Sequence, residues 1–270
     1  LYLNPFSSDK FGQALMQQMG SDGVVLSQPQ AIQAVTSLAV VHVNESGHPS
    51  YAFYRDGVAD RQVNAAQMVA DCATHDATID MVCTGALALD ARDQNVYLPW
   101  LKTEKQRGKC IVIDANLRPS VMPDLQAYRL CVHDFLSIAD IIKVSDEDLL
   151  ALNVPGETPL AQARHVMQTT QAKLIALTMG ANGAWLLTRN GEYFAHETAR
   201  LNIIDTVGAG DSFLAGLLAA LASLNAAGHS LNHVLANLTP EQAQMALAHA
   251  IASASLYVQE RGCIPPTWIQ

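Results

Sequence analysis

Short apolar runs that alternate with longer helical patterns most strongly constrain how this chain can fold. The runs are almost continuously hydrophobic and rich in β-branched residues, as expected of strands that helices bury on both faces. They cover residues 79–84, 110–114, 139–144 and 173–178, and a helix is expected over 160–171. This rhythm predicts an α/β fold with a doubly wound, mostly parallel central sheet and helices on both faces.

Two segments break the rhythm and are predicted to form antiparallel hairpins. In the first, residues 36–43 and 49–55 flank a Glu-Ser-Gly-His turn, and the whole hairpin, about 36–56, would be a small β lid. In the second, residues 183–188 and 192–196 flank an Arg-Asn-Gly turn.

The C-terminal third is predicted to add a short strand and two helices. The strand would be 202–205, ending at Asp205, and a glycine-rich turn would lead from it into a helix that starts at about Ser212. A last long helix is predicted from Pro240, in its first turn, to about Val258.

Composition limits the class of protein. Half of the 270 residues are hydrophobic, which suits one main core, so residues 1–270 are expected to form a single domain. A net charge of −9 argues against nucleic acid or an anionic membrane as partner. No signal peptide or transmembrane span is visible, so the cytoplasm is the expected location. The five cysteines are widely spaced and are expected to be reduced thiols.

The segment that carries chemistry is Asp-Thr-Val-Gly-Ala-Gly-Asp-Ser-Phe, residues 205–213, followed by an apolar helical pattern. Gly208 and Gly210 allow a sharp turn and a close approach of the backbone to a ligand. The amides of Ala209, Gly210 and Asp211 are then expected to be unpaired at the positive end of a helix, which predicts an anion site.

Asp211 in the same turn suggests a second use. A carboxylate beside an anion site can accept the proton of a hydroxyl that approaches a phosphate, and thus act as a general base. The alternative is an ordinary glycine turn in which Asp211 caps the helix. Gly-x-Gly before a helix is weak evidence when it stands alone.

The complete string resembles the C-terminal signature of the ribokinase-like (phosphofructokinase-B type) carbohydrate kinases. Further segments resemble that family in the family's order. They are Asp9-Lys10-Phe11-Gly12, Phe53-Tyr54-Arg55 with Ala59-Asp60, Asp114-Ala115-Asn116-Leu117-Arg118, Lys143 to Asp148, and Thr178 to Gly183. The second and third of these are similar to the fructokinase-like branch.

The resemblance implies an ATP-dependent carbohydrate kinase that transfers the γ-phosphoryl group to a sugar hydroxyl, with fructose the first candidate. It implies Asp211 as base and Gly208, Ala209 and Gly210 as the anion hole. It places Ser145, Thr178, Gly180, Gly183, Gly210 and His249 along ATP. Phe53, Asn116 and Arg118 would contact the sugar, although Phe53 could instead pack in the lid or a dimer interface, and Arg118 could be a surface side chain held by Asp124.

The resemblance also implies metal ions and a dimer. Asp148 would reach magnesium through a water, although the family usually has Glu at that position. Asp205 and the Val207 carbonyl, with a loop around Gly262, would hold a monovalent cation, potassium rather than sodium. Asp205 could instead only cap the turn. A homodimer through the β lid is expected.

The chain also departs from the family. It begins with Leu1, past the family's opening strand and its Gly-Gly-x-x-x-Asn motif, so we expect an N-terminally incomplete domain. The Leu-Trp that often follows the Arg118 passage is replaced by Pro119 to Met122. Three alternatives therefore stay open: a 2-keto-3-deoxygluconate kinase, a nucleoside kinase, and a catalytically inactive relative.

Overall fold

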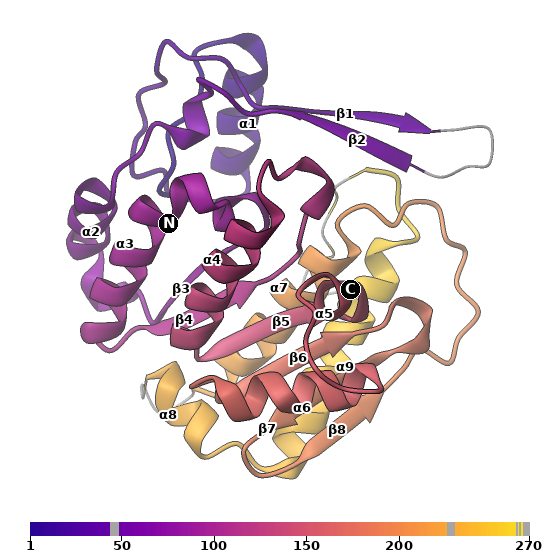
Figure 1. Ribbon diagram of the computed structural model, residues 1–270. Helices are drawn as coiled ribbons and strands as arrows, with labels where there is room; N and C mark the ends of the chain where they lie inside the picture. Colours follow the sequence, from indigo (N-terminus) through magenta and orange to yellow (C-terminus); the bar gives the residue numbers. More distant parts are fainter. Residues whose placement is uncertain (44–48, 226–229, 263, 265, 267–270) are drawn as a thin grey trace.

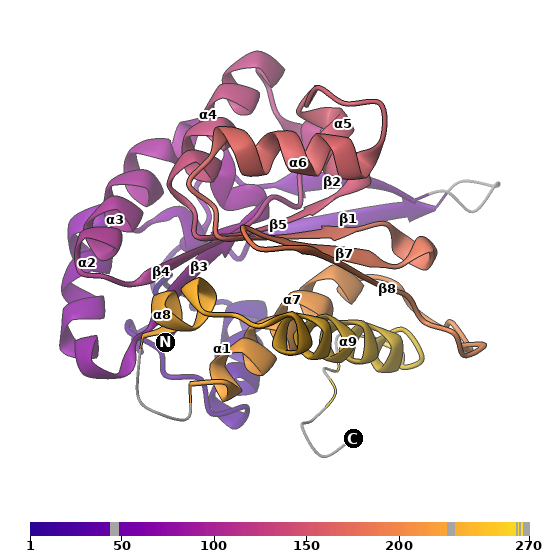
Figure 2. The same cartoon turned by 90° about the horizontal axis from the view of Figure 1, so that it is seen from below.

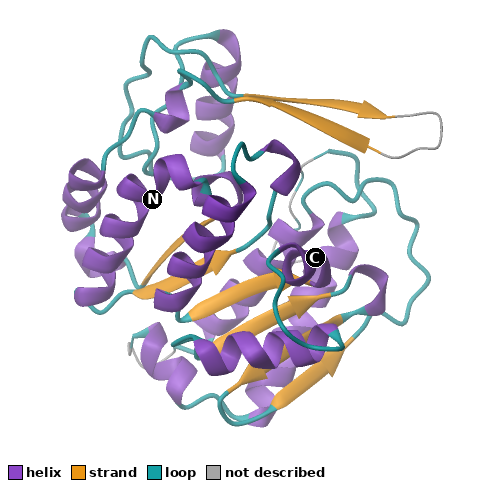
Figure 3. Cartoon of the chain, in the orientation of Figure 1, coloured by secondary structure: helices purple, strands orange, loops and turns teal. Residues whose placement is uncertain are grey.

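The fold is an α/β sandwich around a six-stranded sheet with a separate two-stranded hairpin (Figures 1 and 3). The computed structural model of the chain describes residues 1–43, 49–225, 230–262, 264 and 266. The six strands lie in the order β3-β4-β5-β6-β7-β8. Their bounds are β3 Met81–Gly85, β4 Cys110–Asp114, β5 Ile141–Ser145, β6 Leu174–Thr178, β7 Ala184–Thr188 and β8 Glu192–Ala195.

Strands β3 to β6 are parallel neighbours, whereas β7 and β8 run antiparallel at the far edge. All four predicted parallel strands are confirmed to within two residues at each end, and the second predicted hairpin is β7–β8. The sheet is therefore mixed, and its parallel strands all precede residue 179.

Helices cover both faces of the sheet, as predicted (Figure 2). The helices that connect the parallel strands share one face, because right-handed crossovers that progress in one direction along a sheet stay on one side. They are α3 Gln94–Gln106, α4 Leu125–Ile138, α5 Asp146–Ala151 and α6 Pro159–Thr169, and α2 Ala65–Thr74, which precedes β3, lies on the same face. The helices after the last strand cover the other face: α7 Ala209–Ser223, α8 Leu231–Ala236 and α9 Pro240–Tyr257.

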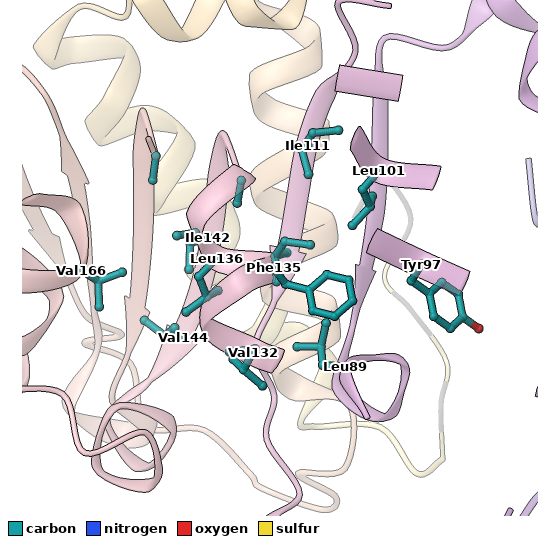
Figure 4. Close-up of a cluster of buried hydrophobic side chains, with 14 of the residues drawn as sticks. Leu89, Tyr97, Leu101, Ile111, Val132, Phe135, Leu136, Ile142, Val144 and Val166 are labelled. Carbon is teal, nitrogen blue, oxygen red and sulfur yellow. The ribbon is translucent and has the colours of Figure 1, made fainter. Parts of the chain in front are cut away.

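The core consists of two apolar layers, one on each side of the sheet. Ile111 and Ile113 of β4 face the connecting helices, where Phe135 of α4 and Leu101 of α3 are fully buried (Figure 4). The alternate residues Cys110 and Val112 pack on the α7 and α9 side. This period of two explains why the strands read as continuous apolar runs.

The segment predicted as a lid is the hairpin of β1 Leu38–Val43 and β2 Pro49–Tyr54, paired from Leu38–Tyr54 to Val43–Pro49. The predicted turn between them, at 44–48, lies outside the described residues. Arg55, which follows β2, is buried and donates to Asp90 and Asp93, at 3.2 and 3.4 Å, so an ion-pair network anchors the base of the lid.

The Asp9 to Gly12 motif also has a structural role in holding the lid. Asp9 caps α1 (Lys10–Ser21) by accepting from the Gly12 amide, and it accepts from both the amide and the hydroxyl of Thr36 just before β1. A Cβ on Gly12 would lie 2.1 Å from the Ser7 carbonyl oxygen. The motif therefore ties the first helix to the entry of the hairpin.

Two element predictions in the C-terminal third are wrong. Residues 202–205 are not a strand, because the amides of Ile204 and Asp205 donate to the Val258 carbonyl at the end of α9. Helix α7 begins at Ala209 rather than Ser212, because Gly208 adopts a left-handed conformation and takes the cap position.

Two smaller observations bear on the composition arguments. Cys72, Cys110 and Cys131 are buried free thiols, and Cys83 is an exposed one, while Cys263 lies outside the described residues. Within the part of the chain that the structure describes, no helix is long and apolar enough to cross a membrane.

Strand β3 is the edge of the six-stranded sheet on the side away from β8. A cavity of about 440 Å³ lies beside it and is lined by Leu1 to Asn4 together with Met81, Val82 and Cys83. The outer backbone groups of an edge strand can pair with another strand.

Helices α7 and α9 pack with their backbones close together. A Cβ on Gly216 of α7 would lie 2.6 Å from the Ser253 Cβ of α9. One turn earlier, Ser212 and Ser253 exchange side-chain-to-carbonyl hydrogen bonds of 3.1 and 2.9 Å. The position of α7 therefore depends on a glycine and a serine pair.

We predict that Gly216→Ala lowers the melting temperature, because the added methyl group forces the two helices apart. The matched control is Gly20→Ala in α1, where a Cβ meets no atom within 4 Å. That change should raise the free energy of unfolding by up to about 1 kcal/mol, through helix propensity alone. Thermal denaturation of both variants checks this, and equal effects of the two would contradict the packing argument.

Candidate active site

The turn before α7 has a conformation that only glycine accepts comfortably. Gly208 has a φ of 90°, and a Cβ there would lie 2.4 Å from the Tyr257 hydroxyl oxygen. That hydroxyl donates a 2.7 Å hydrogen bond to the Val207 carbonyl. The C-terminal end of α9 therefore fixes the turn, and Tyr257 is a residue that the sequence reasoning missed.

The turn leaves two backbone donors available. The Ala209 amide donates to the Thr206 carbonyl at 3.2 Å, so the prediction of three unpaired amides is wrong for Ala209. Among the described residues, no acceptor faces the amides of Gly210 and Asp211. Both amides lie in the first turn of a 15-residue helix, where the helix dipole adds positive potential.

Asp211 is the third residue of α7 and is exposed. Gly208 holds the cap position, and no side chain caps the helix, so the alternative of Asp211 as a helix cap is wrong. Within the described part of the chain, the Asp211 carboxylate makes no hydrogen bond or ion pair. It is free to accept a proton or a hydrogen bond from a ligand.

A cavity of about 500 Å³ joins this turn to the loop after β6. Its lining includes the predicted nucleotide residues Thr178, Gly180 and Gly183 together with Ala209 and Gly210 of the turn. Segments 30 residues apart in sequence thus meet at one hollow. The lining does not include Ser145, His249 or Asp211.

The remaining wall of this cavity was not predicted. It is mainly apolar and comes from the loop after β8 and from α9: Ala199, Leu201, Ile203, Ile251, Ala254 and Val258. Apolar residues in a loop carry no sequence signal of their own. Only the position of the loop beside α9 gives them a common role.

Charged side chains gather at the carboxyl end of β4 and β5. Asp114 and Lys143 are opposite each other in the sheet, and Lys143 Nζ lies 3.0 Å from Asp114 Oδ1. Both side chains are at least nine-tenths buried. Burial raises the pKa of the Asp114 carboxyl to about 6, since the negative charges of Asp211 and Asp148 add to burial and outweigh the opposing attraction of Lys143.

The segment after β5 forms a capping box at the start of α5. Ser145 accepts from the Asp148 amide, and the Asp148 carboxylate accepts from the amides of Ser145 and Leu117 at 2.8 and 2.7 Å. Asp148 therefore fixes the loop that follows β4. Its predicted water-mediated contact with magnesium stays a prediction.

The predicted sugar contacts lie on separate segments. Asn116, in the loop after β4, has a φ of 37°. The Arg118 guanidinium donates to the Asn116 and Leu117 carbonyls, whereas Asp124 caps α4, so Asp124 does not hold Arg118. Phe53 is half-buried in β2, opposite Ala39. Their convergence on a sugar stays a prediction.

The predicted monovalent-cation residues have protein partners of their own. Asp205 Oδ1 accepts from the Val207 amide at 3.0 Å, which is the turn-capping contact of the alternative interpretation. The Val207 carbonyl accepts from Tyr257. Among the described residues, no group of three or more His, Cys, Asp and Glu side chains is arranged to hold a metal ion.

Comparison with known proteins identifies the family. The model of the pfkB family carbohydrate kinases matches residues 2–270. The chain belongs to the pfkB family. A fructokinase of Rhizobium leguminosarum bv. trifolii is 28% identical over 223 residues, 82% of this chain and 65% of that protein. A 2-dehydro-3-deoxygluconokinase of Bacillus subtilis (strain 168) is 26% identical over 231 residues, 82% of this chain and 68% of that protein.

The fold of this pfkB chain agrees with a solved structure. The crystal structure of fructokinase with bound ATP from Xylella fastidiosa has a TM-score of 0.80 and 25% identity, over 96% of this chain and 79% of that one. The ribokinase-like fold and the similarity to the fructokinase-like branch are thereby confirmed. The chain spans just under two thirds of the length of the Rhizobium fructokinase.

We predict that the stability of Asp114→Asn relative to the parent rises as pH rises through the raised pKa of Asp114. A carboxyl with a raised pKa binds its proton more tightly in the folded state, so the parent loses stability as pH rises from about 4 to 6. The asparagine does not titrate, so the variant's advantage should grow by about 2 kcal/mol between pH 4.5 and 7.5.

Urea denaturation of parent and variant at several pH values between these limits measures that advantage. A difference that stays constant with pH would contradict the burial argument. A variant that is less stable than the parent at pH 7.5 would show instead that the pair with Lys143 outweighs burial.

Proposed function

We propose that this protein is an ATP-dependent carbohydrate kinase that transfers the γ-phosphoryl group to a sugar hydroxyl, with fructose the first candidate. One observation carries the proposal. In the first turn of α7, the amides of Gly210 and Asp211 without hydrogen-bond partners lie beside the Asp211 carboxylate, which makes no hydrogen bond or ion pair among the described residues. The turn borders a cavity that the loop from Thr178 to Gly183 also lines. Membership of the pfkB family supports the same activity.

In the proposed mechanism, the chain positions the reactants and stabilises charge. The Asp211 carboxylate accepts the proton of the sugar hydroxyl while that oxygen forms a bond to the γ-phosphorus. The bond between the γ-phosphorus and the bridging oxygen breaks, and its electron pair leaves with ADP. At the Gly208–Ala209–Gly210 turn, the amides of Gly210 and Asp211 bind the charge that develops on the transferred group.

The chemical groups that line the cavity suit the parts of ATP. Thr178, Gly180 and Gly183 supply backbone and hydroxyl groups for phosphates, and the apolar wall from α9 suits an aromatic base. We place Ser145 and His249 beside the nucleotide, as the resemblance implies. Magnesium usually binds through the phosphates and one or two carboxylates, and it would neutralise phosphate charge here. Asp148, whose oxygens keep further lone pairs, is our candidate for a water-mediated contact.

For the acceptor, we propose contacts from Phe53, Asn116 and Arg118. The fructokinase relative favours fructose. A specific observation keeps 2-keto-3-deoxygluconate as second candidate: the relative named 2-dehydro-3-deoxygluconokinase is 26% identical. Arg118 offers a cation that could pair with the carboxylate of such a substrate. Its guanidinium is engaged with main-chain carbonyls, which leaves part of its donor fork for a ligand.

Asp211→Asn should lower turnover by roughly two to four orders of magnitude, because the amide cannot accept the proton. Affinity for ATP should change little, since the backbone amides remain. The matched control is Glu241→Gln, an exposed acid in the first turn of α9. Steady-state kinetics with calorimetric ATP titration measures both quantities. Near-parental turnover in Asp211→Asn would rule out its role as base.

A panel of acceptors with ATP tests the substrate assignment. Fructose should give the highest kcat/KM, ahead of 2-keto-3-deoxygluconate, ribose and nucleosides. A preference for 2-keto-3-deoxygluconate that is lost in Arg118→Gln would replace fructose by the second candidate. Turnover with none of them would contradict the kinase assignment and favour an inactive relative.

We further propose that potassium stimulates the enzyme. Asp205 and the Val207 carbonyl, completed by the loop around Gly262, form an oxygen donor set of the kind that suits potassium. Both oxygens keep a lone pair beyond their contacts with Val207 N–H and the Tyr257 hydroxyl. Turnover should be higher in potassium than in sodium at equal ionic strength, and Asp205→Ala should abolish the difference. Equal turnover of the parent in both salts would refute the site.

Two coarser properties complete the proposal. The exposed apolar side chains of Leu38, Val40 and Tyr54 on the lid support a homodimer through that hairpin. The net charge of −9 supports small molecules, rather than nucleic acid or membranes, as partners. Membership of the pfkB family supports a cytoplasmic location.

A further inference from the structure

Lys143 is a buried lysine in an apolar sheet face that the proposed mechanism does not yet use. It lies near the carboxyl end of β5, and its side chain is 5% exposed. Its neighbours on the same face are the fully buried Val112, Ile141 and Ala176. A charge in such surroundings is costly unless it is well paired, so a lysine here needs a reason.

Among the described residues, Lys143 forms an ion pair with a single carboxylate, that of Asp114. Its ammonium nitrogen lies 3.0 Å from Asp114 Oδ1. Asp114 also lies within electrostatic range of Asp148 and Asp211. Lys143 and Asp114 therefore place charge near the carboxyl ends of β4 and β5, where Asp148 and Asp211 add negative charge.

The ammonium lies directly under the anion-binding turn. A Cβ on Gly210 would lie 3.0 Å from Lys143 Nζ and 3.6 Å from its Cε. Gly210 therefore allows the lysine to approach the first turn of α7. A cation near the positive end of a helix is unfavourable when alone, so this arrangement suits a site that binds an anion.

We propose that Lys143 is a positioning residue for phosphoryl transfer. Its charge, held by Asp114, strengthens the positive potential of the Gly210 and Asp211 amides where negative charge develops on the transferred group. The inference rests on the proposed kinase function, and it adds a residue to which no role has yet been given. The competing explanation is that Lys143 only neutralises the repulsion among Asp114, Asp148 and Asp211.

Two variants separate these explanations. Lys143→Met removes the charge with little loss of packing volume, and Lys143→Met/Asp114→Asn removes both members of the pair, so that no carboxylate is left without its lysine. The matched control is Lys173→Met, which breaks a lysine–aspartate pair with Asp140 (3.1 Å) at the start of β6, the opposite end of the sheet. Each is compared with the parent by kcat, by KM for ATP and by melting temperature.

The proposal expects kcat to fall by roughly 10²-fold in both the single and the double variant, the usual effect of removing one group that stabilises transition-state charge. KM for ATP should stay within a few-fold, and Lys173→Met should keep parental kcat. Recovery of parental kcat in the double variant would overturn the proposal, because it would show that Lys143 serves only to compensate Asp114.

A second measurement does not depend on turnover. Aluminium fluoride should tighten the binding of Mg-ADP to the parent in calorimetry, and this gain should be at least tenfold smaller in both Lys143 variants than in Lys173→Met. An undiminished gain would overturn the role of Lys143 while leaving the kinase assignment intact. If the parent shows no turnover, and aluminium fluoride does not tighten its binding of Mg-ADP, the proposed function is refuted, and the inference with it.

Discussion

The contact on which the candidate site depends is that of α9 with the start of α7. The Tyr257 hydroxyl holds the Val207 carbonyl, and its position requires glycine at 208. Further along α7, Ser212 and then Gly216 continue the same close packing, both against Ser253 of α9. Backbone donors bind an anion well only when they are fixed before it arrives, because reorienting them would cost part of the binding energy. The last helix of the chain thus preorganises a turn that lies 50 residues before its end.

The sheet supplies the charges for that turn. On the face of β4 and β5 that packs against α7 and α9, the alternating apolar side chains are followed by Asp114 in β4 and by Lys143 in β5. The carboxyl ends of parallel strands open toward ligands in α/β folds, so polar residues tolerated there are accessible to function. Burial raises the pKa of the Asp114 carboxyl, so its charged form is disfavoured at this position.

The sequence predicted the local elements well, and the long-range contacts less well. Continuous β-branched runs identified the parallel strands, and the glycine string located the anion turn. Residues 202–205 looked like a strand, but their backbone partner is the end of α9, which no local pattern reveals. Tyr257 and the apolar cavity wall were missed for the same reason, since their roles exist only once α9 packs on α7. The depth of burial of Lys143 required the packed sheet, because a lysine in a strand sequence usually marks an exposed position.

The most direct test of this account is the response of the turn amides to phosphate. Backbone amide resonances of Gly210 and Asp211 can be followed by NMR during titration with adenosine, AMP and Mg-ATP. The account predicts that these two resonances shift strongly with Mg-ATP and little with adenosine, while those of Gly180 and Gly183 respond to the nucleotides as well. Shifts confined to Gly180 and Gly183, with Gly210 and Asp211 unchanged by ATP, would contradict an anion hole at the start of α7.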